Sequence, residues 1–149
     1  MSKFIGIKMI EAVPMKASMA LSAGYKIGNA HPDDMGYEVT YSGGYKSWSP
    51  GKEFEKAYYK LEDPAGDVLK ENDIKRFIKG IENVKVGTKT TNTTLTCLTG
   101  FEVHGQAACV KPENFDLNVG SNYARIKAED KIWEGLKFVL QWAKYGLKK

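Results

Sequence analysis

The residues best suited to chemistry lie in and beside the stretch Gly105–Gly120, which reads GQAACVKPENFDLNVG. Cys109 is a potential nucleophile, and His104 is the nearest potential base. The two residues are five positions apart on one expected strand, so their side chains point to opposite faces of the sheet. We therefore predict that Cys109 is a small buried hydrophobic residue and that His104 is a surface residue of the strand.

Common catalytic and metal-binding patterns are missing from the sequence. It contains no Gly-x-Ser-x-Gly elbow, no phosphate-binding loop and no His-Glu-x-x-His motif. The chain has 2 cysteines and 2 histidines, too few for an ordinary zinc site, and His31 falls in the turn-forming stretch NAHPDDMG. Cys97 and Cys109 are expected too far apart along one hairpin to form a disulfide. We predict that the protein is not an enzyme and needs no metal or cofactor.

The second part of the stretch predicts a corner between a strand and a helix. Pro112 has no N–H group to donate and should end the strand, and a helix should begin near Asn114. Asn114 or Asp116 would cap the first N–H groups of this helix. Such a helix start can also receive a phosphate, although acidic residues at its first turn would repel one. Capping is the interpretation we favour.

Cations follow on the same helix at Arg125, Lys127 and Lys131. Lys127 and Lys131 are four residues apart and therefore neighbours on one helix face. They could clamp a pyrophosphate, or they could pair with Asp130 and Glu134. The sequence leaves both interpretations open.

The elements that must position these residues fall into two modules, residues 1–60 and 72–149, joined by a polar linker at 61–71 that contains Pro64 and Gly66. In the first module we expect a strand at 3–13, a short helix at 17–23, and a hairpin at 36–50 that turns at Gly43-Gly44. Ser49 should then cap a helix whose first residue is Pro50.

In the second module we expect a helix at 73–81, a threonine-rich hairpin, and a long C-terminal helix. A three-residue loop ending at Gly100 would place Leu95, Cys97, Phe101 and Val103 on one face of the hairpin. The fold class is thus α+β, with an antiparallel sheet packed against helices.

The last helix, DKIWEGLKFVLQWAKYGL, is apolar around more of its circumference than a small domain requires. It could be a central helix buried on several sides, or part of it could contact another subunit. Its two tryptophans favour the interface.

Charge and hydropathy limit the partners. The net charge is +4 and shows no concentrated basic stripe, which makes nucleic acid an unlikely ligand. No run of about 18 apolar residues predicts a membrane span, and the charged N-terminus is unlike a secretory signal. We expect a cytoplasmic protein.

The segments KTTNTTLTCLTGFEV, AACVKPENFD and GSNYARIKAEDKIW resemble a family of small tailed-phage proteins, the phage gene 49/gene 66 family. The resemblance covers residues 72–145. Leu98-Thr99 replaces the family's Pro-Asn, and Lys127 stands where the family favours arginine. Separately, GYEVTYSGGYKSWSPGKEFEKAY is similar to a module found ahead of several unrelated phage domains.

This family is similar to the Thoeris anti-defence sponge proteins, which bind a cyclic ADP-ribose-type immune signal without cleaving it. The resemblance implies a homo-oligomer, a dimer or larger ring, that captures such a nucleotide in the host cytoplasm. The alternative is a phage protein-interaction module with no small-molecule ligand. The residues that the resemblance suggests for ligand binding are Lys89, Thr90, Thr91, Asn92, Phe101, Arg125 and Lys127.

Overall fold

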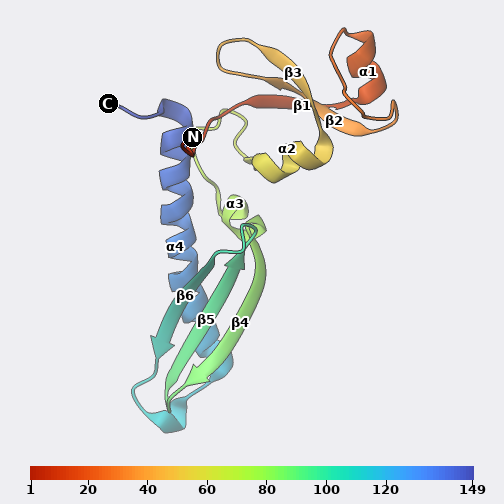
Figure 1. The fold of residues 1–149 in the computed structure, drawn as a ribbon. Helices are drawn as coiled ribbons and strands as arrows, with labels where there is room; N and C mark the ends of the chain where they lie inside the picture. Colours follow the sequence, from red (N-terminus) through yellow and green to blue (C-terminus); the bar gives the residue numbers. More distant parts are fainter. The chain divides into compact units, whose positions relative to one another are not determined.

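A computed structural model describes all residues of the chain, 1–149. The chain divides into two compact units. The first unit comprises Met1–Lys60 and Gln141–Lys149, and the second unit comprises Leu61–Leu140. Each unit holds one three-stranded antiparallel sheet, with strand orders β1-β2-β3 and β4-β5-β6 (Figure 1). The predicted α+β fold with antiparallel sheet and helices is confirmed.

The elements follow one another in a simple order. The first unit contains β1 (Glu11–Lys16), α1 (Ala17–Ser22), β2 (Met35–Thr40), β3 (Lys46–Pro50) and α2 (Gly51–Ala57). The second unit contains α3 (Glu71–Arg76), β4 (Ile78–Val86), β5 (Thr90–Cys97), β6 (Glu102–Ala108), the short 3₁₀-helix η1 (Pro112–Asn114) and most of α4 (Leu117–Tyr145). The long C-terminal helix is thus confirmed, and Gly120 does not interrupt it.

Trp48 lies in the hydrophobic core of the first unit. Its ring is buried against Ala17 and Ala20, and its indole N–H donates to the backbone oxygen of Met15 at 2.9 Å. Gly36 stands beside the ring, where any side chain would overlap with it. The predicted hairpin is confirmed, and Gly44 takes the positive φ of 88° that its turn requires.

Two predictions for the first unit are wrong in whole or in part. The strand expected at 3–13 begins only at Glu11, because the sheet pairs β1 with β2 from that residue onward, and residues 1–10 form no strand. Ser49 does not cap α2: Pro50 occupies the cap position, and the Ser49 hydroxyl is directed to the Pro50 carbonyl oxygen at 3.3 Å.

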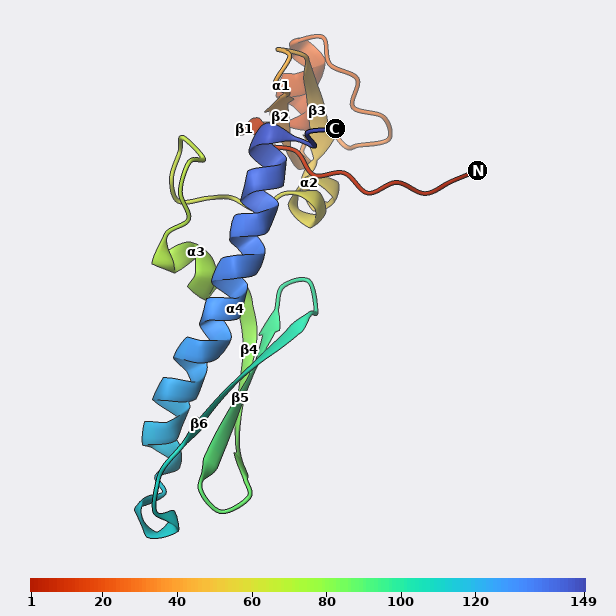
Figure 2. The same ribbon diagram turned by 90° about the vertical axis from the view of Figure 1, so that its left-hand side faces the viewer.

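In the second unit α4 runs along one face of the β4-β5-β6 sheet (Figures 1 and 2). The buried core consists of Ile74, Leu95, Cys97, Val103, Ala128 and Ile132. Helix and sheet come close because the facing residues are small. A Cβ atom at Gly105 would overlap with the carbonyl oxygen of Ala124 and lie 2.5 Å from the amide nitrogen of Ala128. Alternating apolar residues on β5 and a four-residue spacing on α4 thus meet in one core.

Two further predictions for this unit are wrong in part. The helix expected at 73–81 ends at Arg76, and Ile78 begins β4, although Ile74, Phe77 and Ile78 do share the core. The three-residue loop with Gly100 at positive φ is confirmed. Phe101, however, is 71% exposed, because it lies in the loop before β6 begins rather than on the inner face.

Thr91 is buried under α4, and its hydroxyl oxygen has no hydrogen-bond partner. The residue above it is Gly120, whose missing side chain leaves just enough room for the threonine. The next inward residue on β5, Thr93, is equally buried but donates its hydroxyl to the Asn83 side-chain oxygen at 2.6 Å. The two threonines therefore differ in one respect, hydrogen bonding.

This difference predicts opposite effects for one substitution. Thr91→Val replaces an unpaired hydroxyl with a methyl group of the same shape and should raise the free energy of unfolding by up to about 1 kcal/mol. Thr93→Val removes an existing hydrogen bond and should lower the free energy of unfolding by about 1 kcal/mol. Urea denaturation of both variants measures the difference. Equal destabilisation by both would contradict the unpaired state of the Thr91 hydroxyl.

Candidate functional site

A cleft of about 320 Å³ lies between the edge strand β4 and the first turns of α4. It exists because α4 covers β5 and β6 at Thr91 and Gly105 but leaves the inward residues of β4 uncovered, so Ile81 remains 53% exposed. We call it the β4–α4 cleft; it is lined by Ile81, Asn83, Leu117, Asn118, Ser121, Asn122 and Arg125.

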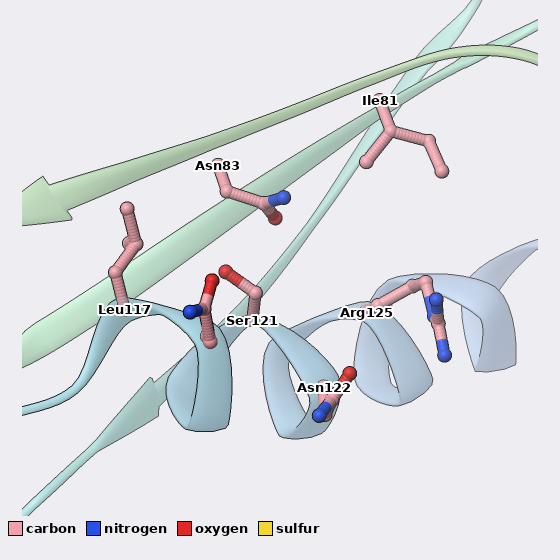
Figure 3. Close-up of a pocket in the computed structure, with 7 residues that line it drawn as sticks. Ile81, Asn83, Leu117, Ser121, Asn122 and Arg125 are labelled. Carbon is pink, nitrogen blue, oxygen red and sulfur yellow. The ribbon is translucent and has the colours of Figure 1, made fainter.

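Most of these side chains are hydrogen-bond donors. Figure 3 shows Asn83 and Ser121 projecting into the space between strand and helix, whereas Asn122 points away from the strands. Because the Asn83 oxygen already accepts the Thr93 hydroxyl, its NH₂ group is the part left to donate into the cleft. Ile81 and Leu117 supply an apolar wall.

Arg125 is the only charged residue of the cleft. Its Nε lies 3.2 Å from a carboxylate oxygen of Glu129, one helical turn further on. A guanidinium has five N–H donors in a planar fork, and this ion pair uses the one on Nε. The side chain is 47% exposed, so the remaining donors can reach an anion. The cleft therefore combines one cation, several amides and an apolar wall.

The first turn of α4 is already capped. The Asp116 carboxylate accepts the N–H groups of Asn118 at 2.9 Å and Val119 at 3.2 Å. The predicted capping is thus confirmed for Asp116. The Asp116 carboxylate therefore occupies the position at this helix start that a phosphate would otherwise take.

The predicted ligand residues do not come together within one chain. Lys89 lies in the exposed turn before β5. Phe101 lies at the other end of β5, where the Phe101 backbone oxygen accepts the Cys97 N–H. Eight residues of extended chain place these ends roughly 26 Å apart. Lys89 and Phe101 therefore cannot contact the same small ligand in one chain.

Three of the predicted residues lie on β5 itself and face different ways. Thr90 and Asn92 are half-buried on the outer face of the sheet, whereas Thr91 faces α4 and is 1% exposed. Thr91 is covered by α4 and is not accessible to a ligand in this structure. Asn92 belongs to a polar row on the outer face, joined by side-chain hydrogen bonds, that also includes Thr94, His104 and Gln106.

Arg125 and Lys127 lie on opposite sides of α4, because two residues turn a helix by about 200°. Arg125 lines the β4–α4 cleft, while the backbone of Lys127 lies next to Gly105 on β6. Lys127 and Lys131 form no ion pairs with Asp130 or Glu134, so the structure does not show the pairing that was one of the two interpretations left open. Of the predicted set, Arg125 lines the β4–α4 cleft.

The two cysteines lie in different surroundings. Both are free thiols, and burial raises the pKa of Cys97, which keeps its thiol protonated. Cys109 is half-buried rather than buried as predicted, and its thiol is 3.1 Å from the Lys111 carbonyl oxygen. His104 is exposed, as predicted, and its Nδ1 is 2.9 Å from the Thr94 hydroxyl.

The amide residues of the cleft were missed from the sequence, although a signal existed. Asn118, Ser121 and Arg125 recur at three- and four-residue spacing and therefore share one helix face. That polar face begins immediately after the Asp116 cap. Asn83, in contrast, has no local signal, because its role depends on where α4 leaves β4 uncovered.

The fold defines an α+β domain in which a long helix covers one face of a three-stranded antiparallel sheet. The profile of the Phage protein (N4 Gp49/phage Sf6 gene 66) family matches residues 69–143, half of the chain. The chain therefore belongs to this family of phage proteins. No curated protein and no solved structure matches it. None of its helices is both long and apolar enough to cross a membrane.

Proposed function

We propose that this phage-family protein is a non-catalytic sponge that sequesters a host nucleotide signal of the cyclic ADP-ribose type and so counters Thoeris defence. The position of Arg125 in an amide-lined cleft carries the proposal. A diphosphate-bridged nucleotide needs a cation for its phosphates, donors for its ribose oxygens and an apolar wall for its base. Arg125, the amides and the Ile81–Leu117 wall match these three needs.

The size of the cleft supports an oligomer. Its volume of about 320 Å³ is at the lower end of the range for small-molecule sites, so we propose that a second copy completes it. On the neighbouring face of α4, Val119, Tyr123 and Ile126 form an apolar stripe, with 52%, 63% and 55% of their surface exposed. Apolar residues in such a stripe are typical of a helix that packs against a partner.

The test is to incubate the protein with cyclic ADP-ribose isomers, remove unbound material, denature with heat and analyse what is released. Intact nucleotide supports the sponge, degraded nucleotide supports an enzyme, and no release contradicts both. Arg125→Ala should weaken binding by roughly tenfold to a hundredfold, as expected for the loss of charge-assisted hydrogen bonds. Lys137→Ala, which removes a cation outside the cleft on the same helix, should leave the affinity unchanged.

A protein-interaction module is the second candidate, favoured by the aromatic side chains of the first unit. The ring of Phe54 is 4.1 Å from that of Tyr37 and 5.0 Å from that of Tyr58. The rings of Tyr41 and Tyr45 are 5.8 Å apart, and Tyr45 is 70% exposed. Accessible tyrosines of this kind are enriched at protein interfaces. A protein that releases no nucleotide, yet loses binding to a phage or host protein with Tyr45→Ala, would favour this function.

A further inference from the structure

Residues 3–10 form an extended segment that has no neighbouring strand. The segment leads directly into β1, and Figure 2 shows it extending to the N-terminus without pairing. Phe4 and Ile5 are 91% and 80% exposed. Lys8 lies over the Tyr41 ring, 4.5 Å from its centroid, and ties the segment to the first unit. We call residues 3–10, together with Glu11 at the start of β1, the N-terminal arm; only Glu11 pairs with β2.

The arm has the composition of a strand but not the hydrogen bonds of one. It contains three isoleucines and one phenylalanine, residue types that favour a pleated, half-buried surface. Unpaired backbone N–H and C=O groups along such a segment are a template for another strand. Pairing further along, at the free edge of β1, is hindered because Pro14 has no N–H to donate.

We propose that the N-terminal arm pairs antiparallel with the same arm of a second copy, about a two-fold axis at Ile7. In this register Lys3 lies opposite the partner's Glu11 at both ends of the ladder. Phe4 lies opposite the partner's Ile10, and Ile5 opposite the partner's Met9. The pairing is isologous, so one segment supplies both halves of the interface and no other surface is required.

Charge complementarity favours this register over those with the axis at residue 6 or residue 8. Opposite charges facing each other across an antiparallel pair stabilise it, and like charges destabilise it. With the axis at residue 8, Lys8 would face the partner's Lys8. With the axis at residue 6, Lys3 would face the partner's Met9 and lose the ion pair. Among these three registers, only the axis at Ile7 gives two ion pairs. The pairings between them are apolar, except that each Lys8 lies opposite the partner's Gly6.

Disulfide trapping tests the register directly. Opposite residues in an antiparallel ladder have Cα atoms about 4.5 or 5.5 Å apart, within the range of a disulfide. Ile7→Cys, in a Cys109→Ser background, should therefore form a disulfide-linked dimer rapidly under mild oxidation. Ile5→Cys should not, because its counterpart is four residues away along the ladder, roughly 13 Å. A mixture of Ile5→Cys and Met9→Cys proteins should crosslink.

Charge reversal is the second test, and the arm lies outside both cores, so folding is not at risk. Lys3→Glu or Glu11→Lys should slow crosslinking of the Ile7→Cys protein by roughly threefold to tenfold, and the double reversal should restore the rate. Equal crosslinking of Ile5→Cys and Ile7→Cys alone, or no recovery with the double reversal, would overturn the proposal. Nucleotide binding at the β4–α4 cleft is a separate property and does not depend on this outcome.

Discussion

Gly105→Ala is expected to lower the free energy of unfolding of the second unit by about 3 kcal/mol or more. The added Cβ would overlap with the Ala124 carbonyl oxygen and lie 2.5 Å from the Ala128 amide nitrogen. Both atoms belong to the backbone of α4, which cannot move aside as the end of a flexible side chain could. The helix would have to lift from β6 and open the core around Val103 and Ala128.

The matched control is Gly80→Ala on β4 of the same sheet. A Cβ at Gly80 would meet only the Thr96 side chain, at 3.7 Å, which is an ordinary contact. This variant should change the free energy of unfolding by less than about 1 kcal/mol. Urea denaturation followed by tryptophan fluorescence compares the two. Similar stability of both variants would mean that α4 does not approach β6 as closely as the structure indicates.

The sheets could be predicted from the alternation of apolar and polar residues and from the glycines in turns, because both are local properties of the chain. Gly44 and Gly100 adopt the positive φ angles that their turns require, and the inward set Leu95, Cys97 and Val103 follows from a period of two. The long helix followed from its apolar residues at helical spacing. These features need no knowledge of what packs against them.

The errors concern segments whose state depends on a distant partner. Residues 4–10 have the pattern of a strand, but no strand in the chain pairs with them. Ile78 continues the helical spacing of Ile74, yet β5 recruits it into a strand opposite Cys97. In both cases the local pattern fits two states, and tertiary pairing decides between them.

Of the residues suggested for ligand binding, Arg125 lines the β4–α4 cleft, whereas Thr91 lies buried under α4. The burial of Thr91 could have been predicted, because it has the same parity on β5 as Leu95 and Cys97, which were already assigned to the inner face. The cleft itself could not be predicted. It arises where α4 packs tightly on Gly105 and leaves the edge strand uncovered, and this depends on the path of the helix over the sheet.

The buried carboxylate of Asp73 in α3 forms hydrogen bonds with the backbone of the segment that precedes this helix. Its side chain is fully buried, and its oxygens accept the backbone N–H groups of Glu62 and Lys70, each at 2.9 Å. The guanidinium of Arg76 donates to the same carboxylate at 2.8 Å. One buried acceptor thus satisfies two backbone donors and one charged side chain.

Asp73→Ala should therefore lower the free energy of unfolding by about 3 kcal/mol, because it removes three hydrogen bonds that share one buried carboxylate. The matched control is Glu71→Ala in the same helix, which removes an exposed ion pair with Lys75 and should cost less than about 0.5 kcal/mol. Urea denaturation measures both losses. Hydrogen exchange adds a local readout: the Glu62 and Lys70 amides should lose protection in Asp73→Ala and keep it in Glu71→Ala. Retained protection of these two amides in Asp73→Ala would show that other acceptors hold the segment.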